Sequence, residues 1–233
     1  MQASQPDEGV RADAVRRAVE AVWRIESGRL IAGLARVTRD LGLAEELAQD
    51  ALVTALELWP RTGIPPNPAG WLATTAKNRA IDVHRRTAVH DRKLEIIGRE
   101  TGDHHDPFAA EVDDALDDHI GDDLLRLIFT ACHPALPMDS RVALTLRCLG
   151  GLSTDEIARA FLIPQSSAAQ RIVRAKRTLT AKNVAFELPG PQELAERVAS
   201  VLEVVFLIFN EGYSATAGLF GDGGRGLDAA GTV

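Results

Sequence analysis

Apolar residues recur at helical spacing along most of the chain, and this pattern predicts an all-α protein. In the N-terminal part the spacing predicts helices over residues 13–40, 43–59 and 69–86. Ser27-Gly28 is a weak point inside the first of these helices, because serine and glycine are poor helix formers. Pro60 and the proline-rich residues 63–68 predict an extended loop between the second and third helices.

The third predicted helix has one apolar side and one polar side. The apolar side carries Leu72, Ala76, Ala80 and Val83. The opposite side carries Thr75, Asn78, Asp82 and Arg85. We expect the apolar side to pack on the other helices and the polar side to remain accessible.

Residues 149–182 predict a helix-turn-helix. Ser153 and Glu156 fit a capping box, in which the Ser153 hydroxyl accepts from the backbone N–H of Glu156 and the Glu156 carboxylate accepts from the N–H of Ser153. A helix therefore begins there, and Pro164 ends it because proline disfavours the α conformation of the preceding residue. Gln165 opens the second helix.

The second helix of this pair is apolar on one side and basic on the other. The apolar stripe consists of Ala168, Ile172, Ala175 and Leu179. The other side gathers Ser167, Gln170, Arg171, Arg174 and Arg177. In a helix-turn-helix the second helix lies in the major groove, where Arg, Gln and Ser pair with base edges and phosphates. The pattern therefore predicts DNA binding, and a solvated basic helix is the alternative.

Residues 87–118 lack sustained apolar periodicity, are acidic, and contain Gly102 and Pro107. They predict a mobile linker that keeps two domains apart. His104-His105-Asp106 suggests a metal or catalytic site, but no third ligand follows at helical spacing, so a linker is favoured. Short helices over residues 124–132 and 140–149 are expected to support the helix-turn-helix.

After Pro189-Gly190-Pro191 the pattern predicts a further helix over residues 192–210. Its broad face is expected to be buried and consists of Leu194, Val198, Val201, Leu202, Val205, Phe206 and Phe209. A helix this apolar needs packing partners that the chain supplies poorly. Residues 218–233 are rich in glycine and have no periodicity that would bury them.

Composition allows two small domains, because 233 residues suffice for two units with a core each. The formal net charge is −7, but the charge is segregated along the chain. Acidic residues crowd into residues 100–123, whereas Arg85, Arg86, Arg92 and Lys93 form a second basic cluster. The potential is therefore expected to be positive where nucleic acid would lie, despite the acidic total.

Several function classes are disfavoured by what the sequence lacks. Cys132 and Cys148 have no CxxC or matching His spacing, which disfavours a disulfide framework or a zinc site and indicates a reducing compartment. The chain has no apolar run of signal or membrane-span length, so a cytoplasmic protein without membrane insertion is expected. It has no phosphate-cradling glycine loop and no nucleophile–base motif, so we expect no enzyme, no cofactor and no metal.

Three motifs carry a resemblance to a known family. They are Leu43-Ala44-Glu45-Glu46-Leu47-Ala48-Gln49-Asp50-Ala51, the Gly70-Trp71-Leu72 run that continues to Asp82, and Arg171-Ile172-Val173-Arg174-Ala175-Lys176. With them the chain resembles bacterial RNA polymerase sigma factors of the extracytoplasmic-function type over most of residues 12–190. The resemblance implies two small helical domains, one sigma-2-like and one a sigma-4-like helix-turn-helix, joined by a flexible acidic linker.

The resemblance also implies a domain order. It gives a sigma-2-like domain over residues 12–88, which binds polymerase and reads the minus-ten element, and an acidic linker over residues 89–118. A sigma-4-like domain over residues 119–187 reads the minus-thirty-five element. The start of a helical extension follows over residues 190–213, and a disordered tail over residues 214–233. Residues 129–136 and 210–213 resemble the subgroup whose extension is similar to tetratricopeptide repeats. The glycine-rich tail departs from that pattern, so a truncated or frameshifted product is expected.

The function implied by the resemblance is binding of core RNA polymerase and promoter-specific initiation. DNA contacts fall on Trp71, Lys77, Asn78, Arg79, Arg85, Arg86, Ser166, Ser167, Gln170, Arg171, Arg174, Lys176 and Arg177. Polymerase contacts fall on Glu45, Glu46, Gln49 and Asp50. For Trp71 a packing role is favoured over base stacking. The alternatives are a helix-turn-helix regulator that works without polymerase and a truncated sigma factor defective in initiation, and an anti-sigma partner is a further expectation.

Overall fold

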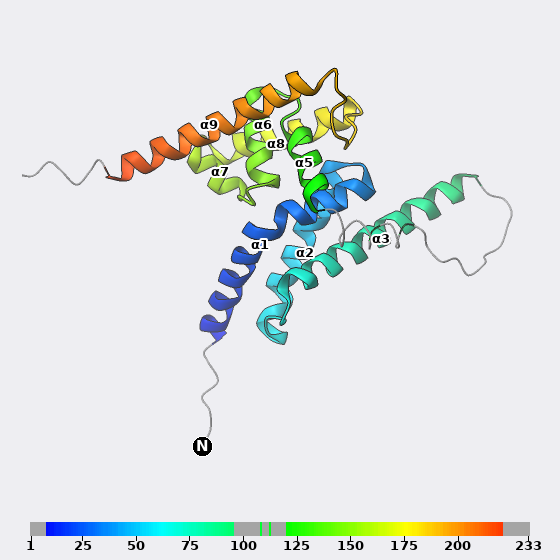
Figure 1. Cartoon of the computed structure of the whole chain (residues 1–233). Helices are drawn as coiled ribbons and strands as arrows, with labels where there is room; N and C mark the ends of the chain where they lie inside the picture. Colours follow the sequence, from blue (N-terminus) through cyan, green and yellow to red (C-terminus); the bar gives the residue numbers. More distant parts are fainter. Residues whose placement is uncertain (1–7, 96–107, 109–111, 113–119, 221–233) are drawn as a thin grey trace, which may run out of the picture.

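The computed structural model describes residues 8–95, 108, 112 and 120–220, and every regular element in them is an α-helix (Figure 1). This confirms the all-α prediction. The helices are α1 (Glu8–Thr38), α2 (Leu41–Thr62), α3 (Pro68–Glu95), α5 (Ile120–Ala131), α6 (Met138–Cys148), α7 (Thr154–Ala160), α8 (Gln165–Ala181) and α9 (Leu194–Phe220). We refer to α1–α3 as the N-terminal unit and to α5–α9 as the C-terminal unit.

The N-terminal unit is built from three helices that bury a shared apolar stripe. The Asp40 side chain caps α2 by accepting from the backbone N–H of Leu43 at 3.0 Å. Pro60 lies inside the last turn of α2 rather than in the loop. The apolar side predicted for the third helix is confirmed, because Leu72, Ala76 and Ala80 are buried in α3.

The predicted weak point in the first helix does not interrupt it, since α1 runs unbroken through Ser27 and Gly28. Both residues are buried, and they face the C-terminal unit. A β-carbon at Gly28 would lie 3.3 Å from the Leu124 side chain, and one at Gly151 would lie 2.8 Å from Ser27 Oγ. The small residues therefore serve close helix approach rather than a bend.

The helix-turn-helix forms as predicted. Ser153 and Glu156 make both hydrogen bonds of the capping box at the start of α7. α7 ends at Ala160, and Leu162 takes a left-handed backbone conformation with φ of 51° before Pro164 leads into α8. The apolar stripe of α8 is fully enclosed, because Ala168, Ile172, Ala175 and Leu179 are each at most 5% exposed.

The prediction for the last helix is wrong about which side is buried. α9 packs on α5 and α6 through Val204, Val201, Leu207 and Ile208. Six of the seven side chains expected to be buried are exposed instead, and they are Leu194, Val198, Leu202, Val205, Phe206 and Phe209. Two polar residues on the inner side also hold the helix, because Arg197 Nη2 donates to the Phe129 carbonyl at 2.7 Å and the Ser200 hydroxyl donates to the Cys132 carbonyl. The helix is apolar on both sides, so its pattern alone did not identify the inner one.

The two helical units that the sequence predicts are present, but they do not stand apart with separate cores. One continuous cluster of buried apolar residues extends from Trp23 and Ile31 of α1 to Leu127 of α5 and Cys148 of α6. α1 lies along α5 and reaches α6, so the two units share an interface (Figure 1). The two units are therefore in direct contact.

Much of the predicted linker and tail lies outside the described residues, including His104-His105-Asp106 and residues 221–233. Two described linker residues pack on the N-terminal unit: the Phe108 ring stacks on His84 with centroids 4.0 Å apart, and Val112 packs on Val37. At its start the segment is more helical than expected, because α3 continues to Glu95. α9 likewise continues to Phe220, beyond the predicted end at residue 210.

Candidate DNA and polymerase interface

α8 presents the predicted DNA-contacting residues on more than one side. Those on its exposed side are Ser166, Gln170, Arg174 and Arg177. Ser167, Arg171 and Lys176 are half-buried on its flanks. The exposed residues span three turns of a helix whose opposite side is fully packed, so α8 can present them to a groove without disturbing the core.

One flank of α8 borders a groove that it shares with the start of α6. Ser167, Gln170, Arg171 and Arg174 line this groove together with Asp139. Arg171 Nη2 lies 3.3 Å from Asp139 Oδ2, so the Arg171 charge is partly neutralised by its own unit. The Asp139 carboxylate repels phosphate, which leaves the exposed Arg174 and Gln170 as the better placed contacts on this side.

The DNA contacts predicted on α3 also differ in exposure. Asn78, Arg85 and Arg86 are exposed, whereas Lys77 and Arg79 are half-buried. Arg79 is held against α2, because its Nη1 donates to Asp50 Oδ2 at 2.9 Å and its Nη2 donates to Thr54 Oγ1 at 2.6 Å. A residue predicted to contact DNA thus pairs with one predicted to contact polymerase.

Trp71 lies at the start of α3 and is half-buried. Its ring meets Trp59 of α2 edge to face, with centroids 5.4 Å apart and planes at 71°. This geometry is typical of aromatic pairs in protein cores. The packing role favoured from the sequence therefore matches the contact that Trp71 makes.

The four predicted polymerase contacts on α2 fall into two environments. Glu46 and Asp50 are exposed, one helical turn apart. Gln49 is half-buried and Glu45 is only 4% exposed. Glu45 accepts a hydrogen bond from Arg147 Nε at 2.8 Å and pairs through its other oxygen with the Lys176 ammonium group. Sequence reasoning missed these partners because they lie more than a hundred positions away.

Sequence reasoning also missed two apolar side chains beside the acidic pair. Val53 is 49% exposed and Leu56 is 40% exposed, and both follow Asp50 along α2 at helical spacing. Exposed apolar residues next to charged ones are typical of protein-binding surfaces. The signal was present in the sequence for Val53, which follows Asp50 by three residues and lies on the same side of α2 as Glu46 and Asp50. Leu56 lies toward the neighbouring side, which also carries Gln49 and Leu52.

The cysteines are placed for packing. Burial raises the pKa of the Cys148 thiol to about 12, and the nearby Glu45 carboxylate acts in the same direction. Burial also raises the pKa of Cys132. Both thiols therefore stay protonated and unreactive at neutral pH. Among the described residues no three His, Cys, Asp or Glu side chains are grouped to hold a metal. None of the described helices is long and apolar enough to cross a membrane.

Comparison with known proteins gives two family matches in the expected places. Sigma-70 region 2 matches residues 24–89, which covers most of the N-terminal unit, and Sigma-70 region 4 matches residues 126–179, from α5 to α8. The chain belongs to the sigma-70 family. The two matches together identify it as a sigma-70 factor of the extracytoplasmic-function type.

An uncharacterized protein of Rhizobium meliloti (strain 1021) is 44% identical to this sigma-70 family chain over 186 residues. The match covers 79% of the chain and 43% of the relative, so the chain spans less than half the length of that relative. No solved structure matches the chain described in this article.

Proposed function

We propose that the chain binds core RNA polymerase and directs promoter-specific initiation, with α3 reading the minus-ten element and α8 the minus-thirty-five element. The observation that carries the proposal is the shared design of these two helices. Each buries an apolar stripe and leaves polar and cationic side chains accessible, Asn78 and Arg85 on α3 and Gln170 and Arg174 on α8. These four residues lie inside the two sigma-70 matches.

The exposed side of α2 supports a polymerase contact. Glu46 and Asp50 supply negative charge, and Val53 and Leu56 supply apolar area beside them. Charge complementarity steers a partner and sets its register, while burial of apolar side chains contributes affinity. A basic and apolar surface on polymerase is the partner that fits. Because core polymerase works in the cytoplasm, the proposal places the chain there as well.

The test is run-off transcription from a promoter library with core polymerase, with and without the chain. We expect specific transcripts only when the chain is present. The Arg174→Ala variant should lower transcript yield and weaken its salt dependence, because one phosphate or base contact is lost. Arg159→Ala is the matched control: Arg159 is also an exposed arginine of the helix-turn-helix, but it pairs with Asp155 within α7.

Three outcomes would contradict all or part of the proposal. If the chain bound specific duplex DNA without polymerase and gave no transcripts, it would be a helix-turn-helix regulator that works alone. If it bound polymerase but supported no transcripts, it would be a sigma factor defective in initiation. Equal yields with the Arg174→Ala and Arg159→Ala variants would remove α8 from promoter reading.

A further inference from the structure

The groove between α6 and α8 holds a carboxylate among the residues that are proposed to contact DNA. Asp139 lies in the first turn of α6, and its side chain is 57% exposed. Its Oδ2 lies 3.3 Å from Nη2 of Arg171, whose side chain is 30% exposed. Gln170 and Arg174 line the same groove. A negative charge therefore lies on the side of α8 that a DNA strand would approach.

The start of α6 explains why an acidic residue is stable at this position. Pro137 precedes the helix and makes no side-chain hydrogen bond to its first turn. The first N–H groups of a helix carry a partial positive charge, and an acidic side chain in the first turn is stabilised by it. With an uncharged side chain at position 139, the same helix start would favour a phosphate instead. Asp139 thus makes the groove repel the DNA backbone.

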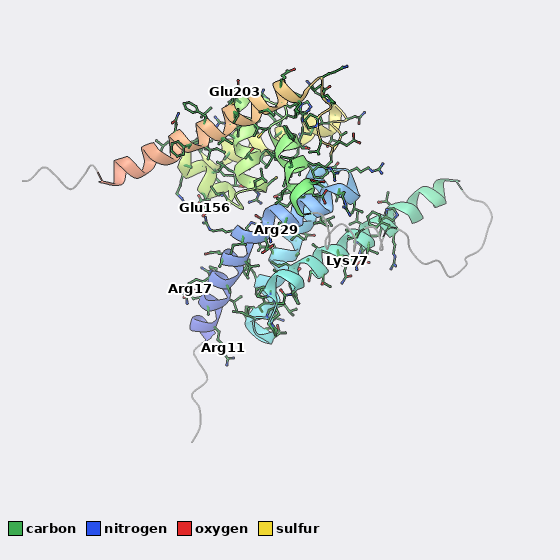
Figure 2. The ribbon with its side chains drawn as sticks, viewed as in Figure 1. Arg11, Arg17, Arg29, Lys77, Glu156 and Glu203 are labelled. Carbon is green, nitrogen blue, oxygen red and sulfur yellow. The ribbon has the colours of Figure 1, made fainter. Side chains whose placement is uncertain are left out.

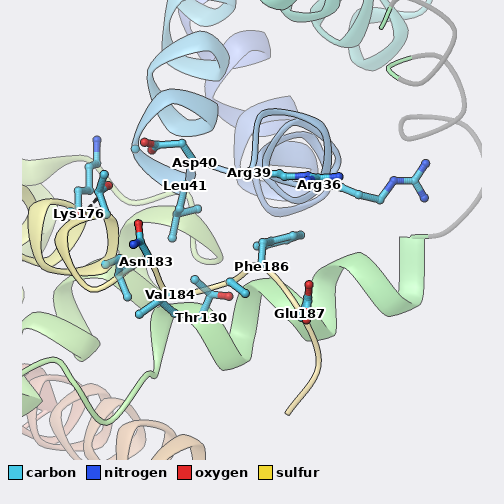
Figure 3. A pocket seen from close by; sticks show the side chains of 14 residues that line it. Arg36, Arg39, Asp40, Leu41, Thr130, Lys176, Asn183, Val184, Phe186 and Glu187 are labelled. Atoms are coloured by element: carbon cyan, nitrogen blue, oxygen red, sulfur yellow. Dashed lines mark hydrogen bonds between the residues drawn. The ribbon is translucent and has the colours of Figure 1, made fainter. Parts of the chain in front are cut away.

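The cations of α8 fall into two groups. Arg174 and Arg177 on the exposed side make no ion pair within the part of the chain that the structure describes. Each of the two flanks carries one cation paired with a carboxylate, Arg171 with Asp139 and Lys176 with a glutamate of α2. Lys176 lies in the groove beside the N-terminal unit (Figure 3). The Arg171–Asp139 pair lies within the C-terminal unit, so it does not depend on how the two units meet.

From this arrangement we propose that Asp139 is a specificity-determining residue for promoter reading, which neutralises Arg171 and repels phosphate so that α8 gains little from DNA without the right bases. This rests on the function proposed above. Nonspecific binding comes almost entirely from phosphate contacts, which every sequence offers. Specificity is a ratio of two affinities, and a repulsive group that lowers the nonspecific one raises this ratio.

The two kinds of complex respond differently to the carboxylate. On a promoter, base contacts by Gln170 and Arg174 hold α8 in one register, in which no phosphate has to enter the groove. On other DNA the helix shifts to whichever register brings most phosphates to its cations. Asp139 removes the registers that would bring a phosphate to Arg171, and this loss falls mainly on nonspecific binding.

The test measures how well DNA without a promoter competes with a promoter. Asp139→Asn keeps the shape of the side chain and removes its charge. Core polymerase with the full chain transcribes a promoter fragment while duplex DNA without either promoter element is added. At 50 mM salt we expect the variant to lose half of its transcripts at a competitor concentration about fivefold lower than the wild type does. At 200 mM salt the difference should fall below about twofold, because the freed arginine adds a phosphate contact that salt weakens.

Three further variants show which group is responsible. Asp155→Asn is the matched control, because Asp155 also pairs with an arginine, Arg159, within α7, the helix that Glu156 marks in Figure 2. It should stay within about twofold of the wild type. Asp139→Glu keeps the carboxylate and should retain wild-type competition. The Asp139→Asn/Arg171→Gln double variant should lose most of the effect of Asp139→Asn, because the freed guanidinium group is then absent.

The outcomes separate this proposal from the proposed function. If the wild-type chain gave no specific transcripts, the proposed function would be overturned and the role of Asp139 with it. If the wild type transcribed and Asp139→Asn competed like it or like Asp155→Asn, only the role of Asp139 would be overturned. An effect of Asp139→Asn that did not weaken with salt, or that remained in full in the double variant, would also overturn it. A lower yield without competitor and with unchanged competition would mean that Asp139 only stabilises α6.

Discussion

α8 and α9 belong to the same unit, and each has an apolar stripe, but only one stripe is covered. In α8 the four stripe residues are enclosed by α6 and α7, and the polar side faces outward. In α9 one side packs on α5 and α6, while Leu202, Val205, Phe206 and Phe209 on the other side are more than half exposed. The difference shows that periodicity identifies residues that share a side and leaves open whether anything covers that side.

The two helices also differ in how they are held. The inner side of α8 is fixed by small and branched apolar residues that fit between two neighbours, and its ion pairs, made by Arg171 and Lys176, lie on the flanks. The inner side of α9 carries polar anchors itself. Arg197 is buried on the inner side of α9 and donates to the Phe129 carbonyl at the end of α5. Arg141 of α6 adds a hydrogen bond to Ser200 at 2.9 Å. A solvent-exposed helix held by few polar contacts should respond to pH and substitution differently from an enclosed one.

The largest expected effect comes from the covered stripe. Ile172→Asp buries an unpaired carboxylate among Ala168, Ala175 and the helices that enclose α8. We expect a loss of about 3 to 5 kcal/mol in the free energy of unfolding, because the charge has no cation to pair with in that stripe. Urea denaturation followed by circular dichroism measures it. A loss below about 1 kcal/mol would mean that α8 is not enclosed as described.

Much of this arrangement could be predicted from the sequence because it is local. The capping box at Ser153, the break at Pro164 and the stripe of α8 each depend on residues within a few turns of one another. The inner side of α9 could not be predicted, because both of its sides are apolar and only the contacts with α5 and α6 distinguish them.

The candidate site shows the same division between local and distant information. The exposed positions of Asn78, Gln170 and Arg174 follow from helical periodicity. The burial of Glu45 does not, because a glutamate on an amphipathic helix is ordinarily exposed and its partners Arg147 and Lys176 come from the other unit. The contact between the units depends on long-range packing that no local pattern records.

A smaller effect is expected from pH at the α5–α6 corner, against which α9 packs. Burial lowers the pKa of His133 to about 4, and the positive charge of Arg197 on α9 acts in the same direction. His133 Nδ1 accepts a hydrogen bond from the backbone N–H of Ala135 at 3.0 Å, which favours the neutral ring. Between pH 6.5 and about 4 the unfolded chain binds a proton that the folded chain does not, so stability falls as pH falls through this window and is then constant.

His133→Asn tests this dependence, because asparagine offers an acceptor in place of Nδ1 and does not titrate. The wild-type chain should lose about 1 to 2 kcal/mol more than the variant between pH 7 and pH 4, a figure reduced from the full shift because the ring is only partly buried. Urea unfolding at a series of pH values gives the two curves. Parallel curves would show that His133 titrates normally and that burial at this corner is weaker than described.

The smallest effect is expected on the open side of α9. Phe206 is 67% exposed, so Phe206→Ser removes no enclosed contact and should change the free energy of unfolding by no more than about 0.5 kcal/mol. The same substitution at Val204, which is 0% exposed, should cost several times more, because Val204 fills the contact with α5 and α6. Thermal unfolding of the Phe206→Ser and Val204→Ser variants compares the two sides of one helix directly. A large loss at Phe206 would reveal a neighbour covering the outer side, and the contrast between α8 and α9 would then disappear.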